Sequence, residues 1–592
     1  MKLKLMIVWT LYMVALPAAA RVIYVDDDAT GTGDGTSWVN AYGTLQDALV
    51  DAEAAQKPVE VNVGQGIYKP DQGQNQVPGD KEAAFQLIDG VTLKGGFAGL
   101  GHTDPNARDI HNFATVLHGD LAGDDGPDFS QYHNNSQTIV RSVHNDATAV
   151  LDGFTITGGL GWSGPGISCY DSNALLMNCV ITKNKSAGRE GGYGGGMYIS
   201  GGSPTLIHCQ FHANWAQADG GGIWCQSHSK PTLSHCQFTN NVATFGGGLS
   251  VAESDPVVTN CIFEHNEAHY GAGLGSRYLG HPLLTNCTFY GNQSPNGEAL
   301  YIGYLGLATA KNCILWDNGK AIAHDEDTSL DITFSNIKGH WPGLGNINVD
   351  PLFAAPGYWT HISDPSLPAE PNDPNAVWIS GDYHLKSQAG RWISQGSTEP
   401  NSVDDNWGFD DATSPCIDAG DPSSPVDLEP LPNGDMINMG AYGQTTEASK
   451  STLDFVSGSL LYTFISDQST LVQTGGFAGV NWTYLIEGEF TLDVDFDART
   501  ASFAQVDARA TDHEFPDRVL DPNTAMNLTN LIGTMGDDGI IRFTGKAANE
   551  VTVNVQMTLE EGLAHLKGQT TPPPGSADFF ILNLDAQAQR MY

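Results

Sequence analysis

The chain has 592 residues, with 27 Lys or Arg against 68 Asp or Glu, so its formal net charge at pH 7 is −41. A surface this acidic repels nucleic acid and anionic lipid, which excludes both as partners. It would also repel an acidic polysaccharide unless cations such as Ca²⁺ bridged the two. Hydrophobic residues make up 40% of the chain, so the charge describes the surface of a folded protein.

Residues 1–20 have the pattern of a secretory signal peptide. Lys2 and Lys4 form a basic region, an apolar run extends from Leu5 to Leu16, and Ala18-Ala19-Ala20 supplies a cleavage site. The apolar run is too short to cross a bilayer. We therefore expect cleavage after Ala20, no membrane span, and a bacterial protein that is secreted, periplasmic or held at the cell surface.

The mature chain begins with a predicted strand and an acidic, glycine-rich loop. Oxygen-rich loops suit Ca²⁺, and Asp26, Asp28 and Asp34 are the candidate ligands in this loop. Two further acidic clusters have the same character: Asp120 with Asp124-Asp125, and Asp404-Asp405. None has the spacing of an EF-hand, so solvated loops remain the alternative for each cluster.

The segment from Leu45 to Ala55 has a helical pattern, because Leu45, Ala48, Leu49 and Ala52 lie on one face. It precedes a series of short apolar strands. We interpret this helix as a cap over the first coil of a solenoid.

A six-residue phrase, Cys-x-(Phe/Ile/Leu)-x-x-Asn, recurs through the middle of the chain at steps of 30, 27, 25, 26 and 26 residues. A phrase of small residues followed by an aliphatic one keeps the same spacing. A fixed period of this size predicts a solenoid with one coil per repeat. The six Cys-to-Asn phrases are Cys179–Asn184, Cys209–Asn214, Cys236–Asn241, Cys261–Asn266, Cys287–Asn292 and Cys313–Asn318.

Each coil reads as three short strands. In the coil from Gly220 to Asn241, alternating residues point inward, and a three-residue step from Leu233 to Cys236 implies a bend. A leucine-rich repeat is the rival fold, but its second half needs a helix. Here that half is rich in glycine, which disfavours helix by about 1 kcal/mol per residue, so a parallel β-helix is favoured.

All nine cysteines lie between Cys169 and Cys416. Six occupy one repeat position with inward parity, so we interpret them as small apolar side chains stacked along the core. Neighbouring coils would bring them within disulfide reach, and pairing in an oxidising compartment remains the alternative.

The paired small-residue and Phe-x-x-Asn phrases resemble the passenger repeats of chlamydial polymorphic outer-membrane proteins. The wider resemblance is to the right-handed parallel β-helix of pectate-lyase-like secreted bacterial proteins. It covers residues 151–337 best, and it implies an all-β fold with a solenoid over residues 21–447. It implies architecture far more specifically than activity.

Beyond a polar linker near residue 450 the pattern changes. Cysteine disappears, and segments such as Phe490–Phe496 and Val551–Leu559 alternate between apolar and polar residues. We interpret residues 452–592 as a separate, smaller antiparallel β-sandwich or barrel domain.

The residue after the aliphatic one in each small-residue phrase should face outward. Tyr198 and Trp224 occupy this position in adjacent coils, and flat aromatic faces suit sugar rings. Trp215 is a further candidate for substrate binding. The alternative is that a loop covers these rings and they form a satellite core.

A candidate catalytic cluster lies in the longest repeat, where Lys185 and Arg189 could act as bases for a polysaccharide lyase beside Glu190. The Asn184-Lys185-Ser186 phrase resembles one in alginate-lyase-like β-helices. A solvated turn is the alternative. For a hydrolase, paired outward acids would serve instead, and the available ones are Glu190, Asp219, Glu264 and Glu298.

Two functions stay open from the sequence. The first is an exported, monomeric β-helix protein that binds, and in the stronger version cleaves, a polysaccharide as a lyase or glycoside hydrolase. The second is a non-catalytic surface or adhesion protein that binds a cell-surface glycan. The absence of recognisable catalytic motifs favours the second, while the aromatic column and the resemblance favour the first.

Overall fold

The computed structural model of the chain describes residues 20–189, 191–295, 299–317, 319–369, 373, 375–393 and 406–451, and beyond them the strands named below. It divides into two compact units. The first is residues 1–385 with 414–427 and 436–448, and the second is 386–413 with 428–435 and 449–592. Most of the expected signal peptide, the Asp404-Asp405 cluster, and Glu190, Glu298 and Asn318 lie outside the described residues.

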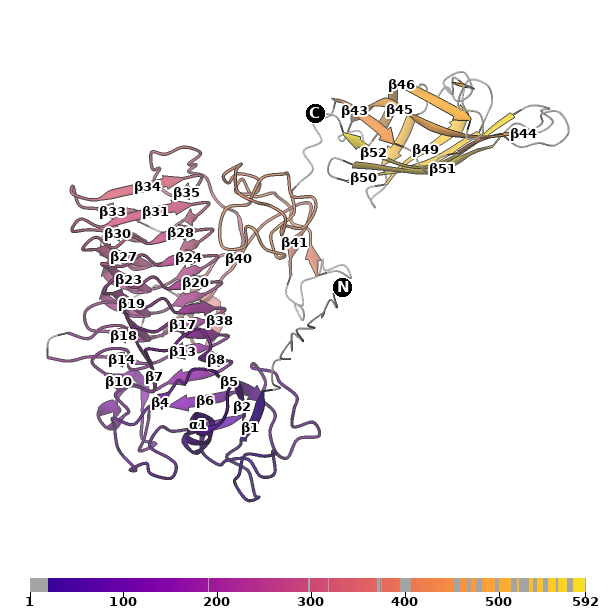
Figure 1. Cartoon of the computed structure of the whole chain (residues 1–592). Helices are drawn as coiled ribbons and strands as arrows, with labels where there is room; N and C mark the ends of the chain where they lie inside the picture. Colours follow the sequence, from indigo (N-terminus) through magenta and orange to yellow (C-terminus); the bar gives the residue numbers. More distant parts are fainter. Residues whose placement is uncertain are drawn as a thin grey trace, which may run out of the picture. The chain divides into compact units, whose positions relative to one another are not determined.

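The first unit is built from three long parallel sheets and a short fourth one, to which successive coils contribute one strand each (Figure 1). The eleven-stranded sheet holds β1 (Arg21–Val25), β2 (Val59–Gly64), β5 (Val91–Phe97), β8 (Val150–Asp152), β12 (Leu175–Met177), β16 (Thr205–Ile207), β20 (Thr232–Ser234), β24 (Val257–Thr259), β28 (Leu283–Thr285), β31 (Leu307–Lys311) and β34 (Ser329–Thr333). The ten-stranded sheet holds β3 (Gly66–Tyr68), β6 (Thr115–His118), β9 (Thr155–Thr157), β13 (Val180–Thr182), β17 (Gln210–His212), β21 (Gln237–Thr239), β25 (Ile262–Glu264), β29 (Thr288–Tyr290), β32 (Ile314–Leu315) and β35 (Asn336–Ile337). The nine-stranded sheet holds β4 (Phe85–Gln86), β7 (Val140–Val143), β11 (Ile167–Tyr170), β15 (Met197–Ser200), β19 (Ile223–Gln226), β23 (Leu249–Ala252), β27 (Leu274–Arg277), β30 (Leu300–Ile302) and β33 (Ile322–His324). The five-stranded sheet holds β10 (Leu160–Gly161), β14 (Lys185–Ser186), β18 (Trp215–Ala216), β22 (Val242–Phe245) and β26 (Glu267–Tyr270).

This arrangement confirms the all-β solenoid of parallel coils. The predicted cap helix is also present as α1 (Leu45–Ala54), whose apolar face is buried in the main core. Two short 3₁₀ turns, η1 (Pro127–Phe129) and η2 (Tyr132–Asn134), lie in a loop before the regular coils. Within the described ranges, no helix is long and apolar enough to cross a bilayer.

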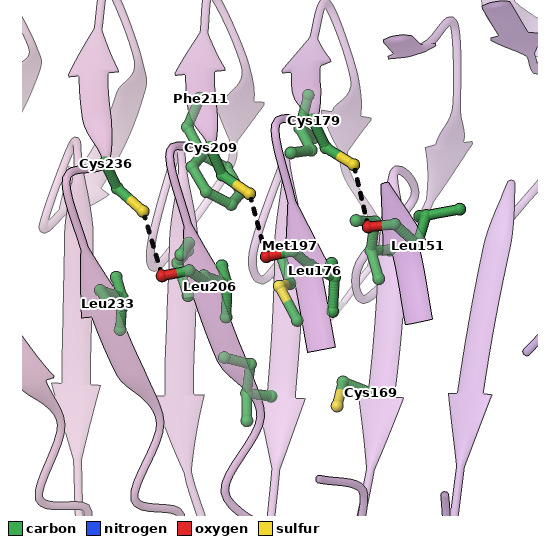
Figure 2. Packing of buried hydrophobic residues seen from close by; sticks show 14 of the residues in the cluster. Leu151, Cys169, Leu176, Cys179, Met197, Leu206, Cys209, Phe211, Leu233 and Cys236 are labelled. Carbon is green, nitrogen blue, oxygen red and sulfur yellow. Dashed lines mark hydrogen bonds between the residues drawn. The ribbon is translucent and has the colours of Figure 1, made fainter. Parts of the chain in front are cut away.

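The core is a set of identical side chains stacked from coil to coil. Phe211, Phe238, Phe263 and Phe289 stack face to face, with ring centroids 4.5–5.1 Å apart. Beside them the repeat cysteines are buried as free thiols, as the core interpretation predicted. Figure 2 shows three of these thiols donating to carbonyl oxygens of the preceding coil, each at 3.6 Å. Parallel in-register pairing makes each coil the template for the next.

The repeat asparagines form a second internal column, which runs from Asn184 to Asn292. From Asn214 onward in this ladder, the side-chain oxygen of each asparagine accepts hydrogen bonds from both the backbone N–H and the side-chain amide of the asparagine one coil before. The ladder ends differently from the prediction. Asn292 donates to Asp317 Oδ1, at 2.6 Å from its backbone nitrogen, so Asp317 takes the position expected for Asn318.

The chain then returns along the outer face of the ten-stranded sheet. There it forms the antiparallel pair β36 (Phe353–Ala355) and β40 (Asp382–Leu385), and a small sheet of β37 (Tyr358–His361), β38 (Asp364–Pro368) and β39 (Ala376–Ile379). A second apolar cluster joins sheet residues to this segment, and it contains Ile262, Ile314, Phe353, Tyr383, Leu385, Cys416, Ile417, Met439 and Ala441.

The second unit contains the antiparallel pair β41 (Arg391–Trp392) and β42 (Trp407–Gly408) and a ten-stranded antiparallel sheet. Pairings in this sheet run in a closed circuit from β45 through β46, β48, β49, β50, β51, β52 and β43 back to β45, which corresponds to the barrel alternative. Its strands are β43 (Gly458–Ile465), β44 (Thr470–Thr474), β45 (Trp482–Asp495), β46 (Thr500–Asp512), β47 (Val519–Leu520), β48 (Ile532–Met535), β49 (Ile540–Lys546), β50 (Thr552–Glu560), β51 (Leu563–Thr571) and β52 (Phe579–Arg590).

Candidate functional site

On the outer face of the ten-stranded sheet, solvent exposure changes along one row of residues that are paired in register from strand to strand. Gln210 and Gln237 are exposed, whereas Ile262, Thr288 and Ile314 are buried. The change occurs because the returning segment covers the later coils: Thr288 Oγ1 accepts the Ala441 N–H at 3.0 Å. The earlier coils, β9, β13 and β17, therefore keep an accessible outer face.

This accessible face is hollowed where the loop around His111 approaches the sheet. The cavity has a volume of about 310 Å³. The apolar side chains of the lining that remain half-exposed are Ile110 and Val180, and hydrogen-bonding groups surround them. The full lining is Ile110, His111, Thr115, Gly153, Phe154, Thr155, Asn178, Val180, His208 and Gln210.

Two residues that line the hollow, Asn178 and His208, lie in turns with left-handed backbone conformation. Asn178 and His208 have φ values of 53° and 51°, a region in which asparagine is tolerated better than most residues. Asn178 Nδ2 donates to Asp152 Oδ1 at 2.7 Å, and Asp152 is ion-paired with Arg108 at 2.9 Å. The side wall is thus fixed before any ligand arrives.

Histidines continue beyond the hollow along the same turn column. The His208 and His235 rings are 4.8 Å apart. Burial lowers the pKa of His235. The pKa of Glu447 is lowered by His384, whose Nε2 lies 3.7 Å from Glu447 Oε2, with a smaller contribution from the two turn histidines. His384 in turn is stacked 3.5 Å from Tyr442 and lies 2.6 Å from Asp382 Oδ1.

The predicted aromatic column points outward but is not exposed. Tyr198 is 6% and Trp224 9% accessible, because Tyr193 from the preceding loop stacks on Trp224 at 4.4 Å. Tyr198 also accepts a hydrogen bond from Gln226. A loop therefore covers the rings, which was the alternative interpretation of the sequence, and the role of Tyr198 and Trp224 in substrate binding stays a prediction.

The predicted catalytic cluster is only partly assembled. Lys185 Nζ lies 5.1 Å from the Trp215 ring centroid and 5.3 Å from that of Phe129, so its ammonium group sits between two aromatic faces. Arg189 is exposed, and Glu190 lies outside the described residues. The structure thus brings Lys185 together with Trp215, a residue predicted for a different role.

Two of the other outward acids hold the fold together. The two carboxylate oxygens of Asp219 accept hydrogen bonds from Arg277 Nη2 at 2.7 and 2.8 Å, and burial raises the pKa of Asp219. Glu264 Oε1 accepts the Trp378 Nε1–H at 2.9 Å, the Gly381 N–H at 2.8 Å and the Tyr383 hydroxyl at 2.6 Å. Glu264 therefore anchors the returning segment on the sheet.

The predicted metal ligands fall into two places. The carboxylates of Asp26, Asp27 and Asp28 lie within 4.8 Å of one another, and burial raises the pKa of Asp26 and Asp27. Asp34 belongs to a separate turn, where Thr32 and Thr36 donate to it and lower its pKa. A second cluster contains His118, Asp120 and Asp125. The sequence predicted the two aspartates of this cluster but not the histidine.

Family comparison agrees with the observed coils. Residues 138–294 and 217–338 match the model of the right-handed β-helix region. This part of the chain is a right-handed β-helix. No curated protein matches the sequence.

Among solved structures, similarity extends to phage tailspikes. The enzymatically active domain of tailspike protein 2 from bacteriophage CBA120 is 10% identical, with a TM-score of 0.28, over 96% of this chain and 79% of that chain. The Dettilon tailspike protein is 10% identical, with a TM-score of 0.27, over 96% of this chain and 95% of that one. These scores are too low for any conclusion about function.

Proposed function

We propose that this is an exported β-helix protein that binds a polysaccharide or cell-surface glycan in the hollow on the outer face of its ten-stranded sheet. The observation that supports this proposal is the chemistry of the lining. Apolar patches from Ile110 and Val180 adjoin the hydrogen-bonding side chains of His111 and Gln210, among others. A sugar ring has the complementary character, with apolar faces and a hydroxyl rim.

The same lining favours a neutral glycan. Of the described residues that line the hollow, none is Asp, Glu, Lys or Arg. The nearby Arg108 already pairs with Asp152 and donates to the Gly95 carbonyl, so a uronate would enter without a free counter-charge. A mainly negative protein would repel it further.

The lining also favours binding without cleavage. Glycoside hydrolysis ordinarily needs two carboxyl groups flanking the bond, and the titratable side chains of the lining are His111 and His208. The proposal therefore joins the glycan ligand of the first sequence hypothesis to the non-catalytic character of the second.

Gln210→Ala should weaken glycan binding about tenfold, because one buried hydrogen bond contributes about 0.5–1.5 kcal/mol. A glycan panel screened with and without Ca²⁺ would supply the ligand, and calorimetric titration would measure the affinity of each variant. Gln237→Ala is the matched control, since Gln237 is the exposed register neighbour one coil further on and does not line the hollow.

Equal losses in the two variants, or no loss in either, would remove the hollow from the proposal. Reducing-end and unsaturated-product assays on the same ligands test cleavage directly. Any product formation would contradict the binding-only assignment, and product formation that survives Gln210→Ala would also place the active site outside the hollow.

A further inference from the structure

The loop between β6 and β7 is folded around a single carboxylate. Asp120 Oδ1 accepts the backbone N–H groups of Gly123 at 2.6 Å and Asp124 at 3.3 Å, and its Oδ2 accepts that of Asp125 at 3.2 Å. These contacts lower the pKa of Asp120. They also bring Asp125 back against Asp120, so that ligand atoms of His118, Asp120 and Asp125 lie within 4.8 Å of one another.

A buried amide oxygen without a donor lies at this cluster. Asn135 is only 1% accessible, and its Oδ1 has no hydrogen-bond partner. Its Nδ2 donates to Asp125 Oδ2 at 2.8 Å and to the Gly158 carbonyl at 2.7 Å, which holds the amide against the cluster. The buried Oδ1 atoms of Asp125 and Asn134 are likewise without a partner.

Unpartnered oxygens on three residues of one loop are costly, because each buried acceptor without a donor loses about 1–3 kcal/mol. The local charge is only partly compensated. Asp120, Asp124 and Asp125 are opposed by Lys69, whose ammonium donates to the Leu121 carbonyl at 3.3 Å.

The donor set points to a hard cation. His118 Nδ1 accepts the Asp120 N–H at 3.0 Å, so the neutral ring carries its proton on the other nitrogen and offers no lone pair to a metal. The free ligands are then carboxylate and amide oxygens, which Ca²⁺ prefers.

We propose that Asp120, Asp125 and Asn135 form a Ca²⁺ site that closes the loop before the regular coils. The ion would supply the positive partner that the unpaired oxygens lack. It would fix the Asn134-Asn135 segment against Asp124 and Asp125, to which these asparagines already donate.

Calorimetric titration of the full chain with CaCl₂ tests this proposal through the Asp125→Asn variant. The variant keeps the side-chain shape and removes the charge, so it should bind one Ca²⁺ fewer than the wild type, or bind that ion at least tenfold more weakly. Asp128→Asn is the matched control, since Asp128 is an exposed acid of the same loop, and it should bind as the wild type does. The difference in the number of Ca²⁺ ions bound by the wild type and by Asp125→Asn separates this site from any Ca²⁺ held by Asp26 and Asp28.

Thermal unfolding supplies the second measurement and controls for misfolding. In EDTA, Asp125→Asn should melt no lower than the wild type, because it removes one negative charge from beside Asp120 and Asp124. In Ca²⁺, the wild type and Asp128→Asn should gain stability by more than Asp125→Asn does. An equal Ca²⁺ count and an equal gain in all three proteins, or no Ca²⁺ bound by the wild type, would overturn the proposal.

Discussion

Asn241→Ala is expected to lower the free energy of unfolding by about 3–5 kcal/mol. Asn241 is fully buried in the asparagine ladder. Its Oδ1 accepts the backbone N–H of Asn214 at 3.1 Å and the Asn214 amide at 3.0 Å, and its own amide donates to the Phe211 carbonyl at 2.7 Å. Alanine would leave the Asn214 N–H without an acceptor and open a small void.

Urea unfolding followed by far-UV circular dichroism measures this loss. Gln237→Ala in the same coil is the control, because Gln237 is exposed and its truncation should change stability by less than about 0.5 kcal/mol. Similar midpoints for Asn241→Ala and Gln237→Ala would mean that the ladder contributes little beyond the strand pairing.

Asp317→Asn is expected to stabilise the protein at neutral pH by about 2–4 kcal/mol. Asp317 is fully buried, and desolvation raises its pKa to about 7. Its Oδ1 accepts from Asn292, but its Oδ2 has no partner. In the preceding coils that second position is an amide nitrogen, which donates to a carbonyl one coil before, so asparagine would restore a hydrogen bond and remove a buried charge.

The gain should depend on pH in a defined direction. Because the folded protein holds the Asp317 proton more tightly than the unfolded chain, folding takes up a proton between the ordinary pKa of 3.8 and about 7. Wild-type stability from this group is fully present below pH 4 and declines as pH rises to about 7. The amide introduced by Asp317→Asn has no proton to lose, so the difference between variant and wild type should grow across that window and level off above it.

Urea midpoints at pH 4, 5.5, 7 and 8 would give this difference directly. Asp331→Asn, which removes the charge of an exposed acid, serves as the control and should show little change at any of these pH values. A constant difference between Asp317→Asn and the wild type would show that Asp317 is ionised in the folded protein across the whole range.

The local sequence pattern was sufficient to predict the structure of each coil. The repeat spacing, the inward parity of Cys and Phe, and the glycine at the start of the four small-residue phrases that the structure describes all correspond to the observed fold. Gly194, Gly220, Gly246 and Gly271 have φ values of 59–66°, where a side chain would be strained. The sequence pattern predicted Asn318 as the last residue of the ladder, but the acceptor is Asp317. The strand before it, β32, has only two residues, so the acceptor lies one position earlier in the chain.

The candidate sites depended on contacts between distant segments. Parity correctly oriented Tyr198 and Trp224 away from the core, but parity carries no information about Tyr193, which covers them. Similarly, Gln210 could be recognised as outward-facing, whereas the approach of Ile110 and His111 to Asn178 and His208 could not. Loops of irregular length have no period from which their contacts can be read.

The sequence by itself determined that this protein is a parallel solenoid, because each coil repeats the same short-range choices of strand, bend and left-handed turn. It also determined which side chains enter the core, since a period of two assigns every strand residue to a face. Only the tertiary structure decided which outward residues remain accessible. The returning segment, the loop at His111 and the Asp120 loop each cover or complete a surface built from coils far away in the chain, and such contacts follow from three-dimensional packing and not from local periodicity.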